Sequence, residues 1–254
     1  MTANAQINAA WEELTAFAGA ADALRLNEVR AIFSIGSLPG GYFRPGQSDL
    51  DVLVLLRGMP HTEMIFSAAQ QQEKQRLETL AAQAAPYEME LIFLHESRLQ
   101  RDPQTGRLPY ADFVQRLLSQ SKLLWGAFDL SSLEAPGKED FACAFRRYLE
   151  YLRKKHGDDF IKQGILTELL KHVLVLMRTY LQVQRGMLEY DKTQLARRYR
   201  ASNPTIALPP GIARALEAQF AGEALTPQIS DAVRAELPTF HSALVEEILR
   251  LNPE

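Results

Sequence analysis

Asp49 and Asp51 stand two positions apart at the start of an apolar run, 52–56. Such a run is typical of a buried strand, and residues i and i+2 of a strand point to the same face. Two carboxylates side by side repel each other and are costly to bury, and a cation between them removes that cost. Mg²⁺ commonly takes one or two carboxylates and completes its shell with water and phosphate oxygens. The pair therefore predicts a site for one or two Mg²⁺ ions.

Groups that could hold phosphate precede this pair. Gly36 and Ser37 follow a short apolar run, 31–33, and offer backbone N–H groups and a hydroxyl. Successive backbone N–H groups in a turn form anion-binding concavities. Arg44 and Ser48 lie in the Gly- and Pro-rich loop that follows, and they are further candidate nucleotide ligands. A metal site beside a phosphate cradle suits the chemistry of nucleotidyl transfer.

A third carboxylate is available on a later strand. Residues 87–94 alternate with the period of a strand, so that the odd-numbered apolar positions share one face and Glu88 and Glu90 share the other. An acid inside an apolar strand is costly unless it has a partner. The alternation by itself leaves Glu88 and Glu90 both open as the partner of the two aspartates.

The order Gly-Ser, a spacer over 38–48 and Asp-x-Asp in a hydrophobic strand resembles the nucleotidyltransferase superfamily that includes DNA polymerase beta. The resemblance implies an α+β domain with a small mixed sheet, ATP as co-substrate, and Asp49, Asp51 and Glu90 as catalytic and metal-binding residues. Glu90 is chosen because 89–93 resembles the hydrophobic strand of the aminoglycoside adenylyltransferases. Glu88 is the alternative carboxylate, as a substrate-binding residue or a solvated one.

Periodicity divides the chain into two domains, 1–135 and 136–254, at a linker rich in Pro and Gly. In the first, we expect a helix over 6–28, strands over 31–36, 50–56 and 87–94, helices over 61–84 and 112–121, and a loop over 95–110. The second reads as an all-α bundle, because apolar residues recur at helical spacing over 141–152 and 166–181. Further helical stretches are expected at 191–200, 210–221 and 228–251, the last one kinked or divided at Pro238.

The segment 166–196 resembles the C-terminal bundle of the streptomycin/spectinomycin adenylyltransferases. There the resemblance assigns Arg178 and Lys192 to the nucleotide phosphates, across a cleft between the domains, and Glu168 to the amines of the acceptor. Tyr110 is the nearest candidate for an aromatic residue that stacks on the acceptor. Each has a simpler alternative as a solvated or packing residue. Gly186 is expected to end the long helix, and Asp191 to cap the next one.

Composition narrows the class of protein. The chain has 254 residues and a net charge of −3, which argues against a nucleic-acid binder. A single cysteine excludes an internal disulfide and, with no visible leader or membrane span, favours a reducing cytoplasm. We expect an adenylyltransferase that modifies a hydroxyl of a small, amine-bearing acceptor, such as an aminoglycoside-like antibiotic, and so confers antibiotic resistance. The alternatives are transfer to a protein or RNA, or a non-catalytic, antitoxin-type member of the fold.

Overall fold

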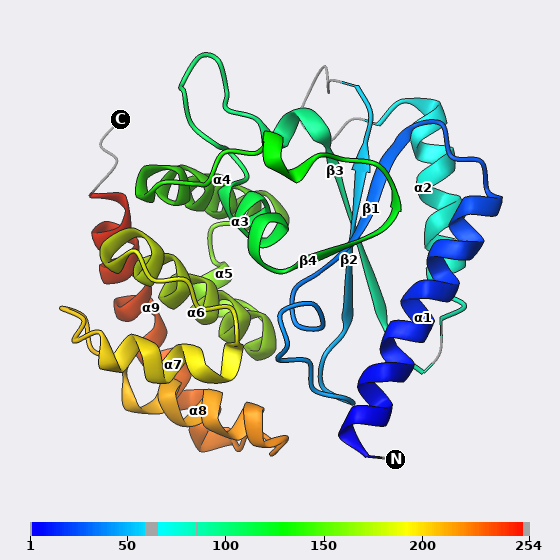
Figure 1. Cartoon of the computed structure of the whole chain (residues 1–254). Helices are drawn as coiled ribbons and strands as arrows, with labels where there is room; N and C mark the ends of the chain where they lie inside the picture. The colour runs from blue at the N-terminus through cyan, green and yellow to red at the C-terminus, as the bar shows by residue number, and fades with distance from the viewer. Residues whose placement is uncertain (1, 59–65, 85, 251–254) are drawn as a thin grey trace. The chain divides into compact units, whose positions relative to one another are not determined.

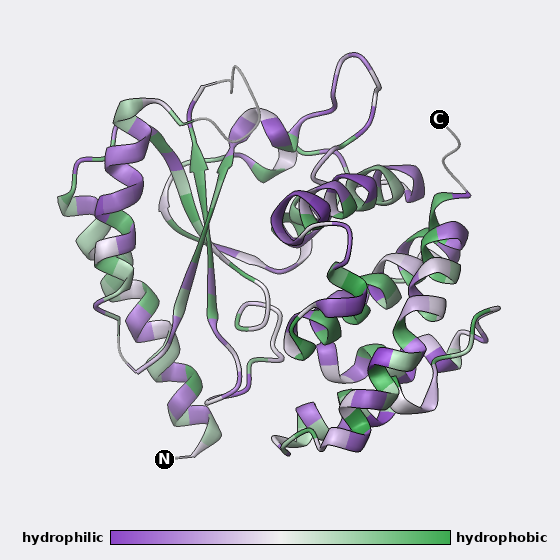
Figure 2. Ribbon diagram, turned by 180° about the vertical axis from the view of Figure 1, so that it is seen from behind, coloured by the Kyte–Doolittle hydropathy of each residue, from purple (hydrophilic) through white to green (hydrophobic). Residues whose placement is uncertain are grey.

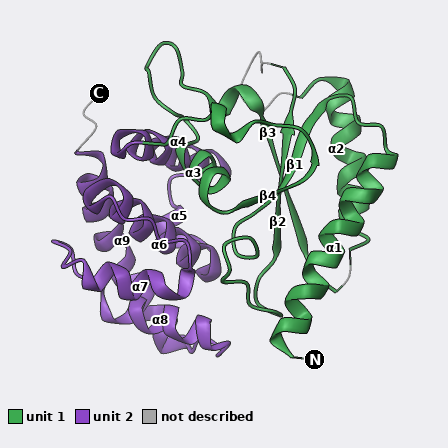
Figure 3. Cartoon of the chain, viewed as in Figure 1, with its two compact units in different colours: residues 1–136 green, residues 137–254 purple. Residues whose placement is uncertain are grey.

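The computed structural model describes residues 2–58, 66–84 and 86–250. These divide into two compact units, 1–136 and 137–254 (Figure 3). The boundary falls in the Pro- and Gly-containing segment that the sequence marks as a linker. That the two units are separate domains stays a prediction. Within the described residues, none of the helices combines the length and apolarity that crossing a bilayer requires.

Unit 1 is built on a four-stranded mixed sheet with the order β3-β2-β1-β4 (Figure 1). The outer strands of the order are β3 (Met89–His95) and β4 (Ser121–Gly126), and the inner ones are β2 (Leu50–Leu56) and β1 (Val29–Ile35). β2 pairs with β3 in parallel, and β1 pairs with both β2 and β4 in antiparallel fashion. The predicted small mixed sheet is confirmed.

Two helices cover one face of this sheet, α1 (Ala3–Ala23) and α2 (Ala68–Ala81). Leu14 and Phe17 of α1 and Leu77 of α2 belong to one buried cluster with Val52 and Val54 of β2. Because strand side chains alternate, the residues between these on β2 point to the opposite face. This alternation places the candidate acids away from α1 and α2.

Several predicted boundaries move. The first helix ends at Ala23 rather than 28, because the chain turns at Arg25, whose φ is +50°, and β1 begins at Val29. The predicted helix over 61–84 is α2, and residues 61–65 lie outside the described part. The expected loop at 95–110 contains a short 3₁₀ helix, Glu96–Leu99. The helix expected at 112–121 is α3 (Ala111–Ser119), and the segment after it forms β4.

The regular elements of unit 2, within the described residues, are all helices joined by short loops. Its helices are α4 (Lys138–His156), α5 (Phe160–Gln163), α6 (Leu166–Tyr180), α7 (Lys192–Ala201), α8 (Pro210–Ala221) and α9 (Pro227–Leu249), and a π-helical turn, Leu181–Arg185, extends α6. Figure 2 shows polar and apolar residues sharing each of these helices, as expected for a bundle. Gly186 follows the π turn with a left-handed φ of +64°, and Asp191 caps α7, as predicted. α9 is continuous through Pro238, so the helix is not divided there, and a kink at Pro238 stays a prediction.

Candidate functional site

The turn after β1 lies directly against the carboxylate of Asp51. Gly36 has φ of +83°, and a Cβ placed on it would lie 2.5 Å from Asp51 Oδ2. Only glycine tolerates both that backbone conformation and that approach. The Gly-Ser pair and the Asp-Leu-Asp strand, which are separated by the spacer in sequence, therefore meet in the fold.

Backbone hydrogen bonds fix the turn at Gly36, and they occupy some of the N–H groups that could otherwise donate to phosphate. Gly36 N–H donates to the Gln120 carbonyl at 3.2 Å, and Gly40 N–H donates to the Gly36 carbonyl at 2.9 Å. The N–H of Gly36 therefore already has a protein partner, and the contact of Gly36 with phosphate stays a prediction. Within the described residues, the N–H and hydroxyl of Ser37 show no protein partner. Ser37 is therefore the better-placed donor of the two.

The rest of the loop closes on itself. Arg44 N–H donates to Ser48 Oγ at 3.1 Å, and Ser48 N–H donates to the Arg44 carbonyl at 2.9 Å. The hydroxyl of Tyr42 donates to Gln120 Oε1 at 2.8 Å. Arg44 is exposed and Ser48 is half-buried. These contacts give Ser48 a structural role in the loop, and the role of both residues as nucleotide ligands stays a prediction.

The candidate acids come from neighbouring strands. Asp51 and Glu90 are register partners in the parallel pair β2–β3. Register partners in a parallel pair point to the same face of the sheet. Asp49 precedes Asp51 by two residues, and Glu88 precedes Glu90 by two. The N–H of Leu50 donates to the Glu88 carbonyl at 2.8 Å, which keeps these two segments side by side. Asp51 is half-buried, and Asp49, Glu88 and Glu90 are exposed. Glu90, which sits beside Asp51, is thus better placed than Glu88 to act with it.

The donor set fits Mg²⁺ in one specific way. Among the described residues, no three His, Cys, Asp or Glu side chains gather into a ready-made metal cage. Mg²⁺ does not need one, because it binds through one or two carboxylates and completes its octahedron with water and phosphate oxygens. The hard oxygens of Asp51, with those of Asp49 or Glu90, suit an ion that arrives with a nucleotide. A set of all three carboxylates on one ion stays a prediction.

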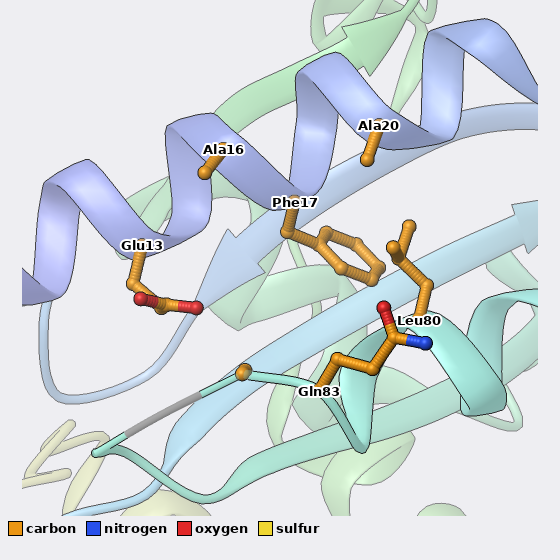
Figure 4. A pocket seen from close by; sticks show the side chains of 7 residues that line it. Glu13, Ala16, Phe17, Ala20, Leu80 and Gln83 are labelled. Carbon is orange, nitrogen blue, oxygen red and sulfur yellow. The ribbon is translucent and has the colours of Figure 1, made fainter.

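A pocket elsewhere in unit 1 does not serve this chemistry. It lies between α1 and α2, is lined mainly by apolar or small side chains such as Phe17 and Leu80, and has a volume of about 170 Å³ (Figure 4). Sites for drug-sized ligands have volumes of about 300–1,000 Å³. Because Phe17 packs on the sheet face opposite Asp51, this pocket is a packing gap under the helices rather than part of the candidate site.

The sequence-predicted residues of unit 2 differ in their surroundings. The guanidinium carbon of Arg178, on α6, lies 5.4 Å from the ring centroid of Tyr190. Lys192 is exposed in the first turn of α7. Glu168 forms an ion pair with Lys171 at 3.2 Å on the surface of α6, the arrangement expected of a solvated acid. Their roles toward nucleotide and acceptor stay predictions.

Tyr110, the predicted aromatic contact of the acceptor, packs within unit 1. Its ring centroid lies 6.4 Å from that of Phe113, and the guanidinium carbon of Arg98 lies 6.0 Å from the Tyr110 ring centroid. These neighbours make a packing role sufficient for Tyr110. Sequence reasoning missed two residues. The Gln120 carbonyl accepts a hydrogen bond from the Gly36 turn, and the ring of Tyr190 packs against the guanidinium of Arg178. No local pattern marks either residue, since both act through tertiary contacts.

Comparison with known proteins bears on the fold. No family model and no curated protein matches the chain. A spectinomycin adenyltransferase from Enterococcus faecialis, solved with ATP and spectinomycin, is similar over 96% of this chain and 99% of its own, with a TM-score of 0.57 at 16% identity. A toxin–antitoxin protein solved with AMP-PNP is 17% identical over 58% of this chain and 98% of its own, and its TM-score of 0.27 adds nothing to the assignment. The chain therefore has the nucleotidyltransferase fold that the Gly-Ser and Asp-Leu-Asp elements predicted.

Proposed function

We propose that this protein is a nucleotidyltransferase that moves AMP from ATP to a hydroxyl of a small, amine-bearing molecule. The observation that carries the proposal is the meeting of Asp51 with two other elements. Its carboxylate lies against the Gly36 turn, and Glu90 is its register partner on the next strand. A carboxylate pair beside a turn with an available hydroxyl and N–H at Ser37 is what binding and attacking a triphosphate requires.

Charge explains why a cation belongs in this proposal. Residues 1–136 contain 16 acidic and 11 basic side chains, so the unit that carries the candidate site is itself negative. Phosphates brought next to Asp49 and Asp51 would be repelled at short range. Bound Mg²⁺ would neutralise that repulsion and polarise the α-phosphate. Asp49 and Asp51 would hold it, and Ser37 would donate hydrogen bonds to the outer phosphates.

The residues of the chain then divide the reaction between them. The acceptor oxygen attacks the α-phosphorus, the bond from that phosphorus to the bridging oxygen breaks, and pyrophosphate leaves. Glu90 accepts the proton of the attacking hydroxyl, as a base within about 2.6–3.2 Å or one water of it can. Arg178 and Lys192 bind phosphate, and Glu168 binds an acceptor amine. An acceptor of the spectinomycin type is the first to test, because the similar adenyltransferase was solved with that compound.

Binding of the nucleotide is tested first, since it needs no known acceptor. Mg-ATP at a hundredfold excess over its Kd should stabilise the native chain by about 2.7 kcal/mol, whereas ATP with EDTA should do so much less. Asp51→Asn should remove the metal-dependent part of the rise in Tm, and Glu12→Gln, an exposed acid on α1, should keep it. An equal rise with and without metal in the unaltered chain would refute the proposed site.

Turnover is tested by pyrophosphate release from ATP against a panel of aminoglycoside and aminocyclitol acceptors. Glu90→Gln should lower turnover by roughly two to four orders of magnitude while Mg-ATP still binds. Glu88→Gln is the matched control, two residues away on the same face, and should be mild. If Glu88→Gln is the inactive variant, the base has been assigned to the wrong carboxylate. Mg-ATP binding without transfer to any acceptor would remove the proposed substrate class but leave the nucleotide site.

A further inference from the structure

Arg178 is held against an aromatic ring in unit 2. Its guanidinium carbon lies 5.4 Å from the ring centroid of Tyr190, inside the roughly 6 Å range of cation–π attraction. Tyr190 is only 6% exposed, so the ring is a fixed surface rather than a mobile one. The interaction is worth about 0.5–1 kcal/mol at exposed sites and about 2 when desolvated.

Tyr190 is itself fixed from two directions. Gln182, which is buried, donates through Nε2 to the Tyr190 hydroxyl at 3.3 Å. Gln182 lies on the π-helical turn Leu181–Arg185 that extends α6, and such turns recur at functional sites. Asp191, the residue that follows Tyr190, is the N-cap of α7, and its side chain accepts a hydrogen bond from Thr193 N–H at 2.9 Å. The ring therefore has little freedom relative to α6.

We propose that Tyr190 is a positioning residue that holds Arg178 as an anion-binding group of the helical unit. The inference rests on the proposed function, which assigns Arg178 to the nucleotide phosphates. A free arginine side chain gives up about 2 kcal/mol of rotamer entropy when it is ordered. Stacking on Tyr190 orders it before the ligand arrives. The contact uses the face of the guanidinium, whose N–H donors lie in its plane and suit phosphate oxygens.

The test is the affinity for Mg-ATP, measured by isothermal titration calorimetry on the full chain. Tyr190→Leu removes the ring and should weaken binding by about tenfold, the equivalent of 1.4 kcal/mol. Tyr190→Phe keeps the ring and should stay within about threefold. The matched control is Tyr151→Leu, which removes the ring of an exposed tyrosine that lies 5.6 Å from Lys155 in the same unit. It should leave the affinity unchanged.

An Arg178→Ala background separates positioning from general damage to the fold. If Tyr190 acts through Arg178, adding Tyr190→Leu to Arg178→Ala should weaken Mg-ATP no further. Wild-type affinity in Tyr190→Leu, or a full tenfold loss in the double variant, would overturn the inference and leave the proposed function standing. If Arg178→Ala alone binds Mg-ATP normally, the assignment of Arg178 fails, and the positioning role fails with it.

A second measurement covers the case in which Tyr190→Leu does not fold. The Nε–H resonance of Arg178, assigned by its loss in Arg178→Lys, should carry a ring-current shift in the unliganded chain. Tyr190→Phe should keep that shift, and Mg-ATP should perturb the resonance. A resonance at the position of a solvated arginine would show that the guanidinium is not held by the ring, and would overturn the inference.

Discussion

A buried histidine should make the stability of unit 2 depend on pH. His172, on α6, is 1% exposed, and its Nδ1 lies 3.0 Å from the Tyr148 hydroxyl of α4. Its ring centroid lies 5.1 Å from that of His241 on α9 and 5.9 Å from that of Phe160 on α5. Burial, and to a lesser extent the charge of His241, lowers the pKa of His172 from 6.5 to about 3. The folded chain thus holds His172 neutral.

The sign and size of the effect follow from this shift. A basic group with a lowered folded pKa is protonated more readily in the unfolded chain. The stability is therefore complete above pH 6.5 and is lost as the pH falls from 6.5 through about 3. At pH 5, which is above the folded pKa, the loss from His172 is about 2 kcal/mol, at 1.36 kcal/mol per pH unit below 6.5. Burial also lowers the pKa of His241, which adds a loss of the same sign.

The assay is urea unfolding followed by circular dichroism at 222 nm, at pH 8 and pH 5. The comparison variant is His172→Gln, whose amide does not titrate and can still bond the Tyr148 hydroxyl. Carboxylates also contribute to the pH dependence, but they contribute equally to both proteins. The fall in unfolding free energy from pH 8 to pH 5 should be about 2 kcal/mol smaller in the variant. An equal fall in both proteins would refute the neutral, buried state of His172.

Two further predictions concern unit 1. Gly36→Ala should weaken Mg-ATP binding at least tenfold, because the added Cβ would lie 2.5 Å from Asp51 Oδ2 and push that carboxylate away. Gly41→Ala is the control, since Gly41 also has a positive φ but a Cβ there meets nothing within 4 Å; an equal loss of binding in both variants would contradict the steric explanation. Glu73, buried on α2, accepts from three backbone N–H groups of the chain entering β1, and Glu73→Gln should lower the unfolding free energy by about 1–3 kcal/mol. Exposed Glu78→Gln on the same helix is its thermal-unfolding control and should change Tm by much less.

The sequence predicted what depends on local pattern. The alternation over 87–94 placed Glu90 opposite the apolar face, and the apolar run after Asp51 predicted β2 with its observed bounds. The nucleotidyltransferase fold was expected from the resemblance to that superfamily that the Gly-Ser and Asp-Leu-Asp residues carry. The two strand predictions succeed because burial of one strand face imposes a period of two that residue types display directly.

The errors fall where distant contacts decide. α1 ends before the apolar pattern does, since Glu73 binds the backbone of residues 27–29 and draws the chain into β1. β4 is too short to be recognised without its partner, β1. The N–H of Gly36 is taken by the carbonyl of Gln120, some eighty residues away in the sequence. Neither composition nor spacing displays such contacts, so the sequence could not show that this N–H has a protein partner, and its phosphate-binding role stays a prediction.

During synthesis on the ribosome, β1 is made long before β4, the strand that pairs with one of its edges. β4 begins about 86 residues after β1 ends, and at roughly 5–20 residues per second this takes about 4–17 s. Through that interval one side of β1 presents unpaired backbone groups beside Phe33 and Ile35, a template for pairing with another chain. A nascent chain stalled between β3 and β4 therefore carries an unpaired strand edge that favours aggregation, and pairing with the six-residue β4 removes that edge.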